Sequence, residues 1–137
     1  MDDSLASVRS HLRSTYGNIL AAIAASADAT ADSWPGESVT ERQRVVDPFR
    51  SALDERDVLD ELPGLLEDLV ATVGEDLTAS PVAAPPYIVV TSTGVLLRGT
   101  LPGRRLVVAV SPFAVDRNPS PTYYRRDELA IEVSWAE

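Results

Sequence analysis

Arginine and tyrosine gather at two places in the second half of the sequence, and they are the best candidates for a contact site. Arginine binds carboxylates and phosphates through paired hydrogen bonds, and tyrosine offers a rigid apolar ring with a polar end. Nucleic-acid bases also stack on tyrosine rings. The predicted partner-binding residues are Arg104, Arg105, Tyr123, Tyr124, Arg125 and Arg126.

A structural role for the same residues is the alternative interpretation. Asp116, Asp127 and Glu128 lie close by in the sequence and offer carboxylates to the arginines. One of the two tyrosines would then pack beneath a loop. The two interpretations differ in whether the guanidinium groups end in ion pairs within the chain or stay available to a partner.

Candidates for catalysis and metal binding are few. His11 is the only histidine and the chain has no cysteine, whereas a zinc site needs three or four ligands. A Ser–His–Asp triad would have to use His11, yet no serine lies in the pattern that exposes such a nucleophile. The sequence therefore predicts no catalytic set and no metal site.

Carboxylates and glycines form two further patterns. Asp54, Asp57 and Glu61 would share one face of an unbroken helix, where paired carboxylates bind Mg²⁺ or perform acid–base work. Acidic residues are spread over the whole first half, however, which favours a solvated acidic surface. Gly94 and Gly99 lack the lysine of a phosphate-binding loop. We predict no cofactor.

Apolar residues recur every three or four positions in the first half, which predicts three amphipathic helices. The first is expected over residues 4–27. The third is expected over residues 58–77, with Asp60 as its N-cap, so that Pro63 falls in the first turn.

The start of the second helix has two interpretations. Ser38 and Glu41 have the spacing of a capping box, which would begin the helix near Val39 and leave a kink at Pro48. Otherwise the helix begins at Pro48 itself, with Asp47 as its cap.

Strand signals begin after residue 86. Residues 87–92, 95–101 and 105–113 are rich in β-branched and aromatic side chains and are separated by short turns, which predicts an antiparallel meander. Residues 129–135 alternate apolar and polar side chains and predict a fourth strand. Residues 116–127 are expected to form a long loop.

These elements predict one α+β domain over residues 1–137, with three N-terminal helices packed on a C-terminal four-stranded, mainly antiparallel sheet. The helical half comprises residues 1–78 and the β half residues 87–137. Residues 79–86 are proline-rich and are expected to form an extended connector.

The charge of the chain is strongly acidic and unevenly placed. The net charge is −9, all 12 basic residues are arginine, and residues 1–80 hold 16 of the 21 acidic residues. In this composition the chain is similar to a family of small uncharacterised acidic proteins of halophilic archaea. The resemblance implies a saline cytoplasm, in which a Debye length of about 3 Å leaves recognition to packing and short hydrogen bonds.

Function is expected to lie in binding rather than in catalysis. No apolar run is long enough to cross a bilayer, so we expect a cytoplasmic protein with no membrane partner. The predicted function is a non-catalytic protein-interaction or accessory domain, with another protein or a second copy as partner. A nucleic-acid-associated regulator is one alternative, which the net charge disfavours. A small-ligand binder or enzyme with a pocket between helices and sheet is the other.

Overall fold

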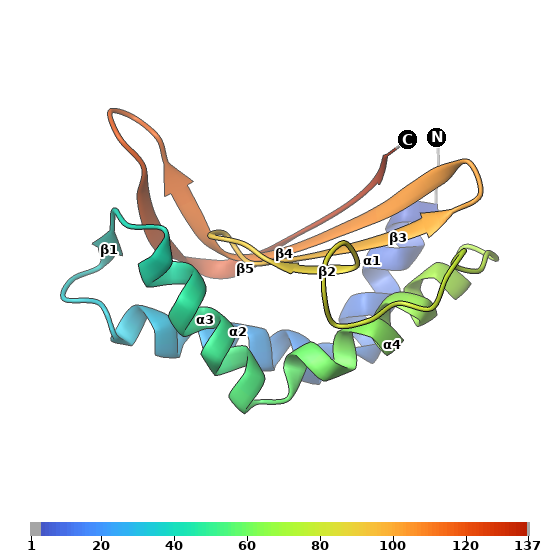
Figure 1. Ribbon diagram of the computed structural model, residues 1–137, viewed down its shortest axis with the longest axis horizontal. Coiled ribbons are helices and arrows are strands. Elements are labelled where there is room, and N and C mark those ends of the chain that lie inside the picture. Colours follow the sequence, from blue (N-terminus) through green and yellow to red (C-terminus); the bar gives the residue numbers. More distant parts are fainter. Residues whose placement is uncertain (1–3, 137) are drawn as a thin grey trace.

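The computed structural model describes residues 4–136, in which four helices lie on one side of an antiparallel five-stranded sheet (Figure 1). The α+β class is confirmed, with one helix and one strand more than predicted. The helices are α1 (Ser4–Thr15), α2 (Gly17–Asp32), α3 (Gln43–Glu55) and α4 (Val58–Ala71). The strands are β1 (Ser38–Val39), β2 (Ile88–Val90), β3 (Val95–Leu101), β4 (Arg104–Asp116) and β5 (Thr122–Ala136), in the order β1-β5-β4-β3-β2.

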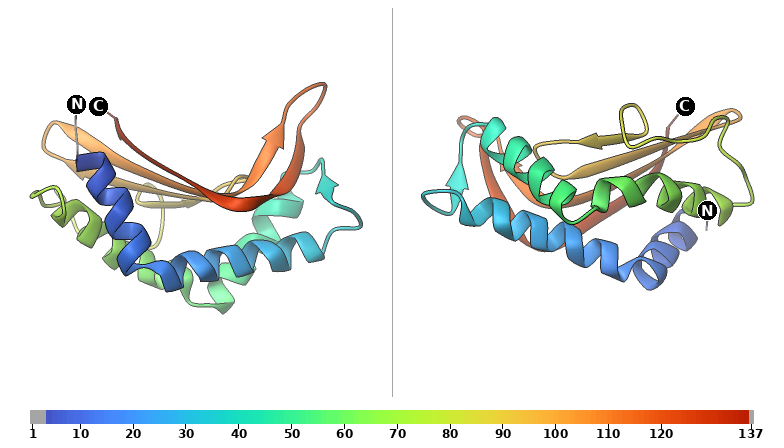
Figure 2. Two further views of the ribbon diagram at one scale, coloured as in Figure 1. Left: turned by 180° about the vertical axis from the view of Figure 1, so that it is seen from behind. Right: turned by 60° about the horizontal axis from the view of Figure 1, so that its bottom comes forward.

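The predicted first helix is divided in two at Tyr16, which leaves helical geometry with φ −113° and ψ 30°. Its amide still donates to the carbonyl of Leu12, and its own carbonyl accepts from the amide of Leu20. The apolar period therefore continues across the break, which is why one helix was predicted. The Tyr16 hydroxyl donates to Asp68 in α4, so the break coincides with a bond to another helix. Figure 2 shows the resulting angle between α1 and α2.

Both predicted starts of the second helix are wrong. Ser38 and Val39 form β1 and pair with Tyr124 and Tyr123 of β5, so no capping box forms there. Strand pairing across the chain prevails over the local capping signal at these residues.

The helix α3 begins at Gln43 and runs through Pro48. Proline has no amide to donate to the carbonyl four residues earlier, which belongs to Arg44. The indole nitrogen of Trp34 donates to that carbonyl at 2.9 Å. A side chain from the loop before β1 thus supplies the donor that proline removes, and this explains how the helix tolerates Pro48.

The helix α4 begins at Val58, the first residue of the predicted apolar stripe, but ends at Ala71, earlier than residue 77. Asp57 precedes it with a left-handed φ of 58°, a conformation that aspartate tolerates better than most residues. Asp60 lies inside the first turn and is not the cap, so that prediction is wrong. Leu77 still packs on the core from beyond the helix end, which accounts for the helix-like spacing of apolar residues there.

The strands β2, β3 and β4 confirm the predicted meander, but the predicted loop over residues 116–127 is wrong. The strand β4 extends to Asp116 and β5 begins at Thr122, so only residues 117–121 connect them. A register irregularity between Ser111 and Phe113 changes which side chains face inward. This bulge interrupts the two-residue alternation of apolar and polar side chains. The sequence pattern therefore did not indicate a strand beyond the bulge.

One buried cluster joins the helical and β halves. Its members include Val8, Leu12, Ile23, Phe49, Leu66 and Leu69 from the helices and Leu97, Leu106, Val108 and Phe113 from the sheet. The rings of Phe49 and Phe113 meet edge to face with centroids 5.2 Å apart. Such contacts add to the stabilisation that burial of the rings already provides.

Gly99 in β3 lies in close contact with α4 and the segment that follows it. A Cβ atom at this position would stand 2.8 Å from Leu77 and 3.3 Å from both Leu66 and Val70. The absence of a side chain therefore lets the helix sit directly on the strand. The odd-numbered residues of β3 consequently face the helices.

The Trp34 bond predicts a coupled effect on stability. Trp34→Phe removes the donor to the Arg44 carbonyl and should lower the free energy of unfolding by about 1–2 kcal/mol beyond any packing loss. In a Pro48→Ala background, where an amide again serves this carbonyl, the same change should cost about 1 kcal/mol less. Equal losses in both backgrounds, measured by urea unfolding, would contradict this account of α3.

A second prediction concerns the helix–sheet contact. Gly99→Ala should destabilise the fold by about 1–3 kcal/mol, because the added methyl group meets three side chains in a packed interior. Gly64→Ala is the matched control, since it lies in α4 with open space around it and should stabilise by about 0.5–1 kcal/mol. Thermal or urea unfolding of the two variants checks this. If Gly99→Ala lowers the free energy of unfolding no more than Gly64→Ala does, the contact between α4 and β3 is not tightly packed.

Candidate functional site

The six residues predicted to bind a partner lie in two separate groups. Arg105 pairs with Ala136 near one end of β4, and Tyr124 pairs with Ala114 near the other. Ala114 lies nine positions after Arg105, which corresponds to about 30 Å along the strand. The structure therefore does not bring the two groups onto one surface patch.

Arg125 is held within the fold and has little of its side chain left for a partner. Its Nε donates to Asp28 at 3.0 Å, and its terminal nitrogens donate to the carbonyls of Pro112 at 3.2 Å and Ala24 at 3.4 Å. Only 18% of the side chain is exposed. Arg125 thus joins the β4–β5 hairpin to α2, and its carboxylate partner is Asp28 rather than one of the nearby acids that the structural interpretation named.

The neighbours of Arg125 are divided between interior and surface. Tyr123 is buried, whereas Tyr124 is 43% exposed. The Nε of Arg126 donates to the carbonyl of Phe113 at 3.3 Å. A surface hollow of about 930 Å³ lies beside these residues, and its carboxylates are Asp28, Asp32, Glu37, Asp116 and Asp127. This acidic lining opposes phosphate binding at the hollow.

Arg104 and Arg105 point to opposite faces of the sheet, because neighbouring residues of a strand alternate. Arg104 donates to Glu75 at 2.9 Å and lies over the ring of Trp135 at 3.6 Å from its centroid. It ties the segment after α4 to the sheet. Arg105 lies on the face that the helices do not cover.

That uncovered outer face is a feature that the sequence reasoning missed. All four helices lie on the inner face, and the strands bend so that both ends of the β3–β4–β5 region rise away from them (Figures 1 and 2). The side chains on the outer face include Leu96, Arg98 and Thr100 from β3, Arg105, Val107 and Ala109 from β4, and Glu132 and Ser134 from β5. The apolar side chains among them are Leu96, Val107 and Ala109, and each is partly exposed.

The signal for this face was present in β4. Residues 106–110 are apolar without interruption, whereas an antiparallel strand with one solvated face normally alternates apolar and polar side chains. An unbroken apolar run is typical of a strand that is covered on both faces. In the described part of the chain, only one face of β4 has such a cover.

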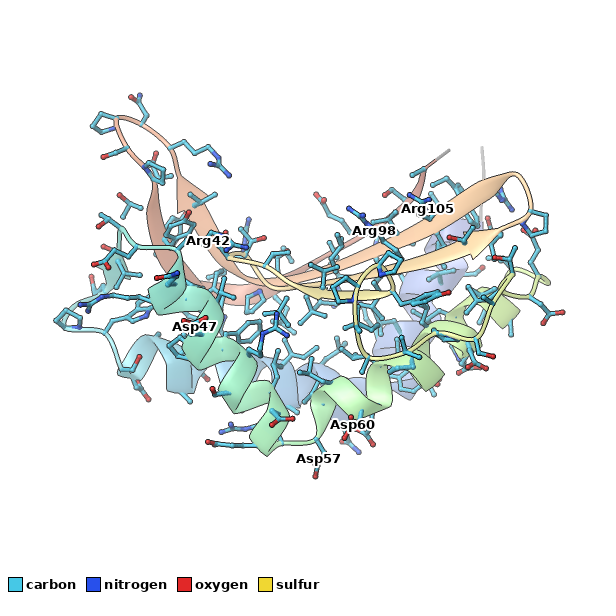
Figure 3. All side chains as sticks on the ribbon, viewed as in Figure 1. Arg42, Asp47, Asp57, Asp60, Arg98 and Arg105 are labelled. Carbon is cyan, nitrogen blue, oxygen red and sulfur yellow. The ribbon has the colours of Figure 1, made fainter. Side chains whose placement is uncertain are left out.

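Arg98 and Arg105 are the two cations of the outer face. Thr100 is the direct partner of Arg105, and Arg98 is paired with Val107, so the two arginines are diagonal neighbours on adjacent strands. Diagonal positions stand about 7–8 Å apart. Figure 3 shows both side chains on the side of the sheet away from the helices. Neither guanidinium group makes a hydrogen bond or ion pair to any residue between 4 and 136.

The only histidine belongs to a small polar cluster between helices. The Nε2 of His11 lies 2.7 Å from Oδ2 of Asp68, and the hydroxyl of Tyr16 donates to the same oxygen at 2.6 Å. The hydroxyl of Thr15 lies 3.3 Å from Nδ1 of His11. The cluster fastens α1 and the start of α2 to α4.

These contacts shift two pKa values in opposite directions. The hydrogen bonds from Tyr16 and His11 lower the pKa of Asp68. Partial burial, together with the hydrogen bond and the charge of Asp68, raises the pKa of Tyr16 to about 12. Asp68 is thus held as a carboxylate and Tyr16 as a neutral phenol, as expected of a structural clamp.

The other predicted patterns do not form a metal site in the described part of the chain. Asp54 lies in α3, Asp57 in the link and Glu61 in α4, so no unbroken helix gathers them on one face. No group of three His, Asp or Glu between residues 4 and 136 is arranged to hold a metal ion. No helix there is long and apolar enough to span a bilayer.

Comparison with known proteins gives one match. A family model described as a domain of unknown function, DUF7988, matches residues 6–136. No curated protein and no solved structure matches the chain.

The clamp at Asp68 predicts how one tyrosine titrates. Because the folded state holds the proton of Tyr16 more tightly than the unfolded state does, its stabilisation is complete below pH 10 and is lost as the pH rises towards 12. Ultraviolet absorbance should therefore show one tyrosine ionising last. Tyr16→Phe should remove that step, and Tyr124→Phe should retain it.

Retention of the late step in Tyr16→Phe would contradict the assignment. The same variant should also lose less stability than the parent protein between pH 10 and 12, measured by urea unfolding.

Proposed function

The chain belongs to the DUF7988 family, whose description states no function, and we propose from its geometry that it is a non-catalytic protein-interaction domain. The proposed contact surface is the outer face of the sheet. The observation that carries the proposal is a group of partly exposed apolar side chains on this face, Leu96, Val107 and Ala109, on a side that no helix covers. Apolar surface that is contiguous and rimmed by polar groups is typical of interaction sites.

The layout of charge supports binding at this face. The helical half holds most of the acidic residues, whereas residues 81–137 hold 5 acidic and 6 basic ones. A strongly charged helix layer keeps a protein soluble and discourages association on that side. A partner that contacts the weakly charged sheet removes fewer charges from water than one that contacts the helix layer.

Neither alternative function is supported by a comparable observation. Proteins that track nucleic acid present many cations along the phosphate backbone, while the outer face offers Arg98 and Arg105 beside the carboxylate of Glu132. An enzyme with a pocket between helices and sheet needs space there. The buried apolar cluster fills the interior of this layer, and a hollow of about 440 Å³ between α2 and β5 has Arg13 and Glu128 as the charged side chains of its lining.

We also propose a saline cytoplasm as the working environment, on the strength of composition alone. A net charge of −9 without lysine suits a protein that must stay hydrated in concentrated salt. Binding measurements are therefore best made in molar KCl as well as in dilute buffer, because apolar contact persists where long-range charge effects are screened.

Site-directed photo-crosslinking tests the proposed surface. A photoreactive amino acid at Val107, on the outer face, should form adducts with one or a few proteins in extracts of the source cells, identified by mass spectrometry. The matched control places it at Ser51, which is exposed on α3. Val107 should give specific adducts that Ser51 does not give.

Two results would overturn the proposal. One is the same set of adducts from both positions, which would mean that the outer face has no selectivity. The other is no adduct from Val107 although the labelled protein unfolds in urea as the parent does.

A further inference from the structure

The two unpaired arginines allow the partner to be described chemically. Resting on the proposed function, we infer that the outer face binds an acidic amphipathic helix of another protein, with two carboxylates of that helix on Arg98 and Arg105. Its apolar side would lie on Leu96, Val107 and Ala109.

The first argument is charge complementarity, since guanidinium groups of this chain that meet a carboxylate bind it. Arg44 pairs with Glu41, Arg104 with Glu75 and Arg125 with Asp28. In a chain with 21 acidic and 12 basic residues, carboxylates are available almost everywhere. Arg98 and Arg105 have no carboxylate partner among residues 4–136, and their diagonal positions on adjacent strands place two guanidinium groups together on the uncovered face.

The second argument is geometric. Arg98 and Arg105 stand about 7–8 Å apart at their Cβ atoms, and their side chains are long enough to converge further. Acidic residues four apart on a helix have Cβ atoms about 5–6 Å apart, so the two arginine side chains reach them by converging slightly. A guanidinium group can donate two parallel hydrogen bonds to one carboxylate, which adds orientation to charge attraction.

The third argument concerns the form of the partner. Sheets in two-layer folds are covered by helices, and a helix on the outer face would give β4 the second cover that its apolar run at residues 106–110 is suited to. A helix with aliphatic residues beside its two acids would contact Val107 and Ala109 while the acids reach the arginines. A small dianion such as phosphate would leave this apolar surface in water.

A second copy of the chain fits this face less well. In a two-fold dimer the same patch meets itself, which would bring four arginines together with only the two Glu132 carboxylates of the paired faces. A helix of another protein avoids this repulsion. Self-association therefore serves as an outcome that the experiment must distinguish.

The test uses the segment that crosslinks to position 107. Mass spectrometry identifies the segment, which is then synthesised as a peptide and titrated against the full chain. We expect an acidic sequence with apolar residues at helical spacing. Its Kd should weaken by about tenfold or more in the double variant Arg98→Gln and Arg105→Gln.

The matched control is the double variant Arg42→Gln and Arg50→Gln. It makes the same change in net charge on the helix layer, where both residues are exposed, and should leave the Kd within about twofold. Urea unfolding shows whether each double variant is folded. Inorganic phosphate and a single-stranded oligonucleotide, titrated in parallel, should not compete with the peptide.

The outcomes separate the two proposals. A crosslinked segment without acidic residues, or a Kd that the Arg98 and Arg105 changes leave intact, overturns the acidic helix and leaves the interaction surface standing. Adducts with a second copy of this chain, or competition by the oligonucleotide, also overturn the acidic helix. Absence of specific adducts at Val107 removes the interaction surface itself, and the acidic helix with it.

Discussion

The helices of this chain cover one face of its sheet, and almost every other feature depends on that packing. Helices and strands share one apolar layer, which reaches from Val8 in α1 to Val133 in β5. Because side chains alternate along a strand, the residues that enter this layer determine which residues face away from it. Gly99 and Leu106 face inward as direct partners across β3 and β4. Arg98 and Arg105 must therefore face outward.

Polar interactions in this fold act at its periphery and define where elements end. The carboxylate of Asp68 accepts a hydrogen bond from Tyr16 at the break between α1 and α2. The bond from Arg125 to Asp28 joins the β4–β5 hairpin to α2. Partly exposed ion pairs contribute little to the free energy of unfolding. Their effect is on geometry, because each one selects a single orientation for elements that the apolar layer alone would allow to slide.

Much of the fold followed from the sequence because local periodicity reports burial directly. The meander of β2, β3 and β4 was predicted with small errors at its ends, and the apolar stripe of α4 was correct from Val58 onward. What failed were positions where distant residues prevail over a local signal. Ser38 has good capping chemistry but pairs with Tyr124, and Pro48 is tolerated because Trp34 lies beside it.

The candidate site was harder to predict, and the reason is physical. Sequence identifies arginine but not its partner, so Arg125, bonded to Asp28 across 97 positions, was indistinguishable from an arginine on the surface. Arg98 drew no notice because it is isolated in sequence. It becomes meaningful only when the register of β3 and β4 sets it diagonal to Arg105. The apolar run at residues 106–110 was visible, but it was interpreted only as a strand.

The separation of charge between the two layers decides how a partner can approach. At low salt a net charge of −9 repels an acidic partner at long range, although Arg98 and Arg105 attract it at short range. In molar salt the Debye length falls to about 3 Å, so the repulsion is screened while direct contact between guanidinium and carboxylate is less affected. Burial of Val107 and Ala109 is strengthened or unchanged under the same conditions. An acidic chain with a small basic and apolar face is therefore better suited to bind an acidic helix in concentrated salt than in dilute buffer.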